Sequence, residues 1–380
     1  MRPVVPPDRS RRRWAVRLLS ACLPLPSLCA HAHGESFAVV FINPGKPDEA
    51  YWAAASAMME HAARNLGLQL EVQYADRDHV RGLALARQRA QRAPSARPDY
   101  VVFSNDYGMA PEMLRLLDGA GIRAFMAFSG VHGGAREETG APRERYPFWL
   151  GSLEPNAEEA GYLTARALFA QARASGQGRA QDGKLHLLAI AGDRSTPSSA
   201  ARNAGMRRAV REAGDVVLVQ EVYADWRRDK AAEQALWLYQ RHPEARLVWA
   251  GSDQMAFGAM AAWRERGGTP GRDAWFSGIN TSREALAALR GSELAALAGG
   301  HFMAGAWALV MLFDHSRGID FASEGLEQER SLFVLFDAEL ARRFEQRVDR
   351  ATPAIDFRRF SKALNPQLRR YGFDAVHWLR

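Results

Sequence analysis

Polar and aromatic residues stand at the ends of short apolar runs of this chain, where side chains can bind a small molecule. Asn43 follows FAVVFI (37–42) and Asn105 follows YVVFS (100–104). Parallel sheets place ligand-facing turns at the carboxyl ends of their strands. The ends of further runs hold Phe128, Asn280 and His301. These residue types bind a ligand by hydrogen bonds and ring contacts, without covalent chemistry.

The sequence lacks the motifs of common catalytic and cofactor sites. No Gly-x-Gly-x-x-Gly follows the first apolar run, and there is no Walker loop and no His-Glu-x-x-His zinc motif. The turn GDRST (192–196) has the composition to cradle an anion before a helix, but turns of this composition are common. The sequence nominates no acid–base pair. We expect a protein that is not an enzyme and carries no cofactor and no metal.

The apolar pattern supplies the elements that must position these residues. From Phe37 to about Gly318, short apolar runs alternate with stretches of helical period. Strands that alternate with helices form parallel sheets. Gly67 is placed to end a helix over 49–66, and Asn156 is placed to cap a helix that runs to about Ala174. The pattern predicts an α/β protein with two parallel sheets.

The N-terminus has the three parts of a secretory signal. Six arginines lie within residues 1–17, the segment 18–30 is apolar, and Ala30 and Ala32 suit a cleavage site. The apolar part is too short for a permanent membrane helix. We expect residues 1–32 to be removed and the mature protein to be periplasmic. Twin-arginine export and a lipid anchor at Cys22 remain alternatives.

The charge and the cysteines also belong largely to this leader. The chain has a net charge of +7, of which residues 1–32 supply +5 (six Arg and one Asp), so the remainder carries about +2. The basic character is therefore no sign of a nucleic-acid partner. Both cysteines, Cys22 and Cys29, lie in the leader as well, so the mature chain has no thiol and no disulfide.

Four motifs, in their order and spacing, resemble a known family. They are Asn43-Pro44 with the aromatic pair that follows, SSAARNAG (198–205), YADW (223–226) and GSDQMAFGA (251–259). Over about residues 36–337 the chain resembles type I periplasmic binding proteins of the ribose-binding and autoinducer-2-binding kind. Related repressors carry a DNA-binding helix-turn-helix where this chain has its leader, so the repressor alternative is disfavoured.

The resemblance implies two Rossmann-like lobes, each a parallel sheet flanked by helices, joined by a three-stranded hinge. It assigns 36–151 with 300–330 to the first lobe, and 152–299 with 331–337 to the second. A ligand would bind between the lobes, which close by hinge motion. We expect residues 338–380 to form a helical extension on the outside of the molecule.

The same resemblance nominates ligand contacts. Tyr51, Trp52 and Trp226 would sandwich the apolar face of a sugar-like ring, while Arg202 and Asp253 would bond to its polar edges. The alternatives are that the aromatic residues belong to the core, that Asp253 caps a helix, and that Arg202 forms a surface ion pair.

The chain also departs from the ribose-binding pattern. Phe128 and Ser129 replace an Asp-Arg pair, and Asn280 replaces an Asp. Further replacements are Ser252 for Asn, Ala204 for Arg and Gly299 for Gln. We therefore expect a modified sugar, a polyol or a small signalling molecule in place of ribose. His301 is either a pH-sensitive contact or a plain hydrogen-bonding residue.

The expected partners are a small sugar-like ligand and a membrane protein, with no nucleic acid. The closed form would deliver its ligand to an ABC permease or, alternatively, report it to a histidine kinase or cyclase. We expect the chain to be a monomer. Its basic segment 341–380 is either a docking surface or a structural strap.

Overall fold

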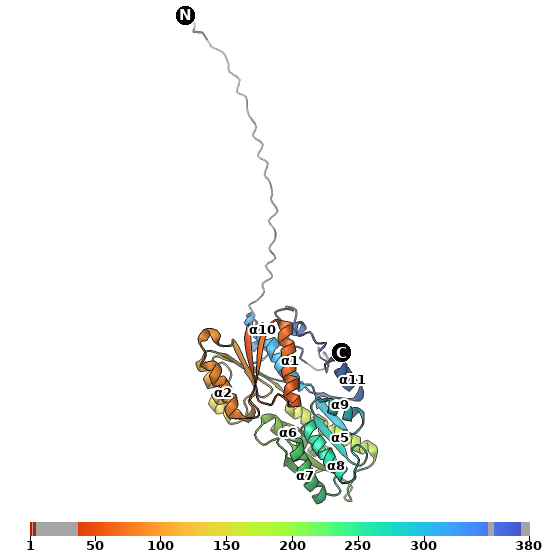
Figure 1. Cartoon of the computed structure of the whole chain (residues 1–380). Coiled ribbons are helices and arrows are strands. Elements are labelled where there is room, and N and C mark those ends of the chain that lie inside the picture. Colours follow the sequence, from red (N-terminus) through yellow and green to blue (C-terminus); the bar gives the residue numbers. More distant parts are fainter. Residues whose placement is uncertain (2, 5–36, 349–352, 374–380) are drawn as a thin grey trace. The chain divides into compact units, whose positions relative to one another are not determined.

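The structure of the protein is a computed structural model (Figure 1). It describes residues 1, 3–4, 37–348 and 353–373. The chain divides into two units, Met1–Glu35 and Ser36–Arg380, and the second contains every helix and strand given below. The predicted apolar leader, its cleavage site and the alternative anchor Cys22 lie outside the described residues. Within the described part of the chain, no helix is long and apolar enough to cross a membrane.

The first sheet has six parallel strands in the order β11-β5-β4-β3-β1-β2. The inner strands β1 and β3 are mostly apolar and buried, as expected for strands covered on both faces. The strands are β1 (Ala38–Asn43), β2 (Gln69–Tyr74), β3 (Tyr100–Phe103), β4 (Arg123–Ala127), β5 (Trp149–Pro155) and β11 (Glu327–Arg330).

The second sheet has the order β12-β10-β9-β8-β6-β7. Its strands are parallel except β12, which pairs antiparallel with β10. The strands are β6 (Leu185–Ala191), β7 (Val216–Tyr223), β8 (Leu247–Ala250), β9 (Trp275–Ile279), β10 (Ala296–Gly299) and β12 (Val334–Leu335). The predicted α/β fold with two largely parallel sheets is confirmed.

Helices flank both sheets, with α1, α2 and α10 around the first and α5 to α9 around the second (Figure 1). Two predicted ends are confirmed: Gly67 follows α1 in the left-handed conformation (φ 69°), and the Asn156 side chain accepts a hydrogen bond from Glu159 N at the start of α5. The helices are α1 (Ala50–Leu66), α2 (His79–Ala90), α3 (Ala110–Gly119), α4 (Ala135–Thr139), α5 (Ala157–Ser175), α6 (Pro197–Ala213), α7 (Arg228–Arg241), α8 (Asp253–Glu265), α9 (Arg283–Arg290), α10 (Ala304–Ser316) and α11 (Ala338–Arg347). Short 3-10 turns are η1 (Pro94–Ala96), η2 (Asp106–Gly108), η3 (His301–Met303), η4 (Ala322–Glu324) and η5 (Phe357–Phe360).

The chain passes between the sheets three times, after β5, after β10 and after β11. The strand β5 continues to Pro155 within the first sheet, beyond the predicted lobe boundary at residue 151. The third passage is short, because β11 ends at Arg330 and β12 begins at Val334. Such a set of connections lets two lobes move about a few backbone positions.

The C-terminal segment contacts helices that flank both sheets. Helix α11 packs against α9, where Glu345 pairs with Arg290. Residues 353–373, called the C-terminal strap below, pack on α1 and α10, and the ring of Phe373 stacks on Trp307 with centroids 4.8 Å apart. The predicted helical extension is wrong for most of the strap, because only η5 within it is helical. Side-chain packing on α10, rather than helical backbone bonding, fixes its path.

Candidate ligand-binding site

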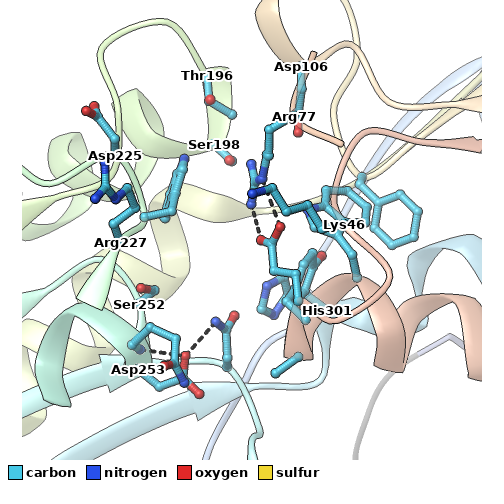
Figure 2. A pocket seen from close by; sticks show the side chains of 18 of the residues that line it. Lys46, Arg77, Asp106, Thr196, Ser198, Asp225, Arg227, Ser252, Asp253 and His301 are labelled. Atoms are coloured by element: carbon cyan, nitrogen blue, oxygen red, sulfur yellow. Dashed lines mark hydrogen bonds and ion pairs between the residues drawn. The ribbon is translucent and has the colours of Figure 1, made fainter. Parts of the chain in front are cut away.

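A cavity of about 740 Å³ opens where the carboxyl ends of both sheets meet (Figure 2). Its wall combines turns that follow β1 to β4 with turns that follow β6 to β9, together with residues of the three passages between the sheets. Figure 2 shows Arg77 and Asp106 on one side of this space and Thr196 and Ser198 on the other. The cavity therefore lies between the two lobes, where the strand-end residues were predicted to meet.

Aromatic rings form the wall that belongs to the first sheet. Trp52 contacts Tyr51 and Phe128 edge-on, with ring centroids 4.9 Å and 5.1 Å away. The Trp52 ring also covers Gly45, because a β-carbon there would lie 2.0 Å from Cδ1 of the indole. All three rings line the cavity and also pack against the core. These aromatic residues therefore belong to the core and also line the cavity. Their contact with a ligand stays a prediction.

Trp226 provides the aromatic face that belongs to the second sheet. It is half-buried, and its Nε1 donates a hydrogen bond of 2.5 Å to Asp193. Asp193 also accepts from the backbone N–H groups of Ser195 and Thr196, over 2.7 Å and 2.6 Å. The turn GDRST, which had the composition of an anion cradle, thus uses its carboxylate to orient an indole.

Arg202 and His301 form a buried pair in the cavity wall. The Arg202 guanidinium donates to Gly251 O over 2.6 Å and to Nε2 of His301 over 3.1 Å. Burial lowers the pKa of Arg202 to about 10, so the side chain is charged at neutral pH. Burial, with the nearby Arg202 charge, holds the pKa of His301 well below its usual value. His301 is therefore neutral near pH 7, which favours the plain hydrogen-bonding role over the pH-sensitive one.

The His301 ring is clamped between two other rings. Tyr51 stacks on one face with centroids 4.7 Å apart, and Phe333 stacks on the other at 4.3 Å. Tyr51 belongs to α1, His301 follows β10, and Phe333 precedes β12. The three stacked rings thus connect a first-lobe helix to two of the three passages between the sheets.

Asp253 lines the cavity but is occupied by bonds within the protein. It accepts from Asn280 Nδ2 over 2.9 Å, from Ser282 Oγ over 2.5 Å and from Gln254 N over 2.8 Å. Burial raises its pKa, and these hydrogen bonds oppose the rise. The helix cap that was its alternative role is taken by Ser252, whose Oγ accepts from Met255 N. Asp253 instead holds Asn280 at the cavity wall.

Three predicted contacts lie outside the cavity wall. Asn43 bonds to Trp52 O, Ser56 Oγ and Gly45 N, so its amide fixes the turn after β1. Asn105 bonds to Gly130 O and Ala110 N and fixes the turns after β3 and β4. Ser129 is buried beside Phe128 and does not reach the cavity. The structure therefore corrects their direct role: these side chains face the protein interior.

Sequence reasoning missed several charged residues of the wall, among them Asp106. This carboxylate is 5% exposed and accepts a hydrogen bond from Ser104 Oγ over 3.2 Å. Burial raises its pKa to about 6, against the attraction of Arg77. Arg77 itself donates from Nε to Glu49 over 2.9 Å and joins the turns after β1 and β2. Asp106 follows Asn105 directly, so the strand-end argument applied one residue further would have found it.

Unusual backbone conformations gather around the cavity. Of the nine non-glycine residues with positive φ in the described part of the chain, seven line it. They are Asp76, Arg77, Tyr107, Phe128, Asp225, Trp226 and Asn280. Such conformations are unfavourable for residues with a β-carbon and gather at functional sites. Among the described residues, no group of three or more His, Cys, Asp or Glu is arranged to hold a metal ion.

Comparisons with known proteins agree with this architecture. A solved structure described as a periplasmic sugar-binding protein from Pseudomonas fluorescens is 38% identical, with a TM-score of 0.81, and the match covers 90% of this chain and 100% of that one. An ABC transporter solute-binding protein from Actinobacillus succinogenes 130z with bound D-allose shares the fold, at 17% identity and a TM-score of 0.68 over 81% of this chain and 99% of that one. So does one from Bacillus halodurans C-125 with bound myo-inositol, at 18% identity and a TM-score of 0.65 over 82% and 98%.

The search of curated proteins found no match. The family model described as "Periplasmic binding protein domain" matches residues 39–320. The resemblance inferred from the four motifs is confirmed at the level of the family, and the comparisons do not single out the ribose-binding or autoinducer-2-binding subtype. The chain belongs to the periplasmic binding protein domain family.

Proposed function

We propose that the protein captures a small sugar-like or polyol-like ligand between its lobes and delivers it to an ABC transporter. One observation carries this proposal: a cavity at the carboxyl ends of two parallel sheets is lined by aromatic rings and by planar hydrogen-bonding groups. Rings match the C–H faces of a sugar, and planar groups match its hydroxyl edges. Solved structures with this fold include a protein described as sugar-binding and an ABC transporter solute-binding protein, which supports the same assignment.

The contacts we propose combine predicted and newly found residues. The aromatic walls are Tyr51, Trp52 and Phe128 on one side and Trp226 on the other, and the polar contacts are Arg202, Asp253, Asn280, His301 and Asp106. Asp253 acts chiefly by holding Asn280. The lobe boundaries, the removable leader, the periplasmic location and the monomeric state belong to this proposal. The sensory alternative is not favoured, because the named relatives are transport components.

The mechanism needs no covalent step. Ligand contacts from both lobes are complete only in the closed form, so a ligand shifts the population toward closure. A set of sugars and polyols, including D-allose and myo-inositol, can be screened by thermal shift, because a ligand that binds the native state raises its melting temperature. Scattering with the best ligand should give a smaller radius of gyration. Recovery of a chemically altered ligand would overturn the proposal.

A further inference from the structure

The cavity contains a buried cation without a counter-ion. Arg202 is 6% exposed, and the two hydrogen bonds of its guanidinium go to a carbonyl oxygen and to a neutral imidazole. A guanidinium has five N–H donors, so three remain, and Nε has no partner in the described structure. No described carboxylate forms an ion pair with Arg202. Buried charges are normally paired, because their desolvation is otherwise uncompensated.

Two carboxylates at the cavity form ion pairs with other residues. Glu49 pairs with Arg77, and Asp225 pairs with Lys230. Asp253 accepts three hydrogen bonds from its own neighbourhood. Asp253 and Asp106 attract Arg202 through space without touching it. The natural counter-ion for Arg202 is therefore missing from the protein itself.

His301 presents a second donor beside Arg202. Arg202 donates to Nε2 of His301, so Nε2 carries no proton and the neutral ring is protonated at Nδ1. Nδ1 is buried and has no partner in the described structure. The rings of Tyr51 and Phe333 fix the plane of the imidazole, so this N–H has one direction.

A third donor belongs to the aromatic wall of the first sheet. Nε1 of Trp52 is buried and has no hydrogen-bond partner among the described residues. Trp52, Arg202 and His301 all line the same cavity. Each unpartnered atom is an N–H donor, so the missing group must be rich in acceptors. A carboxylate supplies two acceptor oxygens and one negative charge, which fits a guanidinium in a forked geometry.

We propose that the ligand is a sugar acid, a uronate or aldonate, whose carboxylate pairs with Arg202 and accepts from His301. This inference rests on the proposed function and narrows its ligand class. The carbon skeleton of the acid lies between the Trp52–Phe128 wall and Trp226, and its hydroxyls reach Asp106 and Asn280. Among the described residues that line the cavity, Arg202 is the buried cation without an ion pair, and Lys46, which also has none, is exposed. One buried cation matches a monoanionic carboxylate better than a phosphate dianion.

The test compares matched pairs by calorimetry at pH 7.5: D-glucuronate with D-glucose, D-galacturonate with D-galactose, D-gluconate with D-glucitol, and their five-carbon counterparts. The expected result is that at least one acid binds tenfold or more tightly than its neutral partner. A neutral partner that binds as tightly as its acid overturns the sugar-acid inference and leaves the proposed function standing. If no compound of either kind binds, both fail. Tighter binding of glucose 6-phosphate than of any acid overturns the choice of a carboxylate.

Two variants of Arg202 and one control variant locate the effect. Arg202→Met should lower the affinity for the preferred acid at least a hundredfold and abolish its advantage over the neutral partner. Arg211→Met is the matched control, because Arg211 is exposed near the end of the same helix and its replacement removes the same charge. Arg202→Lys, which keeps the charge without the fork, should recover part of the lost affinity. An Arg202→Met protein that folds and still prefers the acid would overturn the proposal.

Discussion

The indole of Trp226 lies directly on Gly192, the residue that follows β6. A β-carbon at Gly192 would be 2.3 Å from Cζ2 of the indole, closer than any real contact. Trp52 and Gly45 have the same relationship at the end of β1, where the distance to Cδ1 would be 2.0 Å. In both lobes, therefore, a glycine after a strand lets a tryptophan side chain approach the backbone closely at the cavity. The glycine is needed for the position of the ring.

Gly192→Ala should move the Trp226 ring without removing it. We expect ligand affinity to fall about tenfold, which is ~1.4 kcal/mol, because the indole can no longer occupy its place and bond to Asp193. Calorimetry with the ligand found by screening measures the change. Gly119→Ala is the matched control, because a β-carbon there meets nothing within 4 Å. Equal affinities for the two variants would show that the ring position is unimportant for binding.

Trp226→Ala should weaken binding by roughly 1–3 kcal/mol through lost ring contact and buried area, and it should leave the fold intact. Trp237→Ala is the control, since Trp237 lies on the neighbouring helix α7 and is 67% exposed. Ligand titrations followed by tryptophan fluorescence separate the two variants. If the Trp226 variant unfolds without any specific loss of binding, the residue belongs to the core.

The sequence predicted the sheets better than it predicted the site. Apolar runs such as FAVVFI become buried parallel strands because the helices that connect the strands cover both faces of the sheet. Helix ends such as Gly67 and Asn156 follow from local chemistry and are confirmed. These features depend on residues that are close in the sequence.

The direction of a side chain at a strand end depends instead on the turn that follows. Asn43 ends β1 and Asp106 follows β3, yet Asn43 bonds inward to α1 while Asp106 lines the cavity. A turn with positive φ at Tyr107, which could not be anticipated, shapes the backbone beside Asp106. The prediction of helices was wrong for most of the strap, because its path depends on contacts with residues far away in the sequence. Trp307 and Asp314 are among them.

The leader can be tested by N-terminal sequencing of the protein from a periplasmic fraction. The basic, apolar and small-residue parts predict that the mature chain begins near His33. Intact Met1 on a cytosolic protein would contradict this prediction. A lipid-modified N-terminus at Cys22 would support the anchored alternative in its place.

Asp106 should make the protein less stable as the pH rises from about 4 to about 6. Burial raises its pKa to about 6 from 3.8, so between these values the folded state holds a proton that the unfolded state has lost. The stabilisation is therefore present below the unfolded pKa and lost as the pH rises through the folded one. This shift in the pKa of Asp106 corresponds to roughly 3 kcal/mol of unfolding free energy, which is lost by pH 7.

Asp106→Asn should remove this dependence. Urea unfolding at pH 4 and pH 7 should show that the variant gains stability relative to the wild type at the higher pH. Asp78→Asn is not a suitable control, because Asp78 caps α2; Asp48→Asn, on the exposed rim of the same cavity, is suitable. Parallel pH profiles for the wild type and Asp106→Asn would contradict the prediction.

The C-terminal strap should be essential for stability, because it satisfies a buried charge. Asp314 in α10 is fully buried and accepts from Ser361 Oγ over 2.5 Å, from the backbone of Lys362 and Ala363 over 2.7 Å and 3.1 Å, and from Tyr371 OH over 3.0 Å. All of these donors lie in the strap. Truncation after Val348 would leave this carboxylate unpaired and would uncover Trp307.

We expect that truncation to lower the free energy of unfolding by roughly 3–5 kcal/mol or more, measured by urea unfolding. Truncation after Phe373 is the matched control, because it keeps every strap contact named above. Asp314→Asn in the truncated chain should restore part of the stability, since an amide without partners is less costly to bury than a carboxylate. If the chain truncated after Val348 unfolds at the same urea concentration as the control, the strap is not structural, and the docking alternative for this segment gains support.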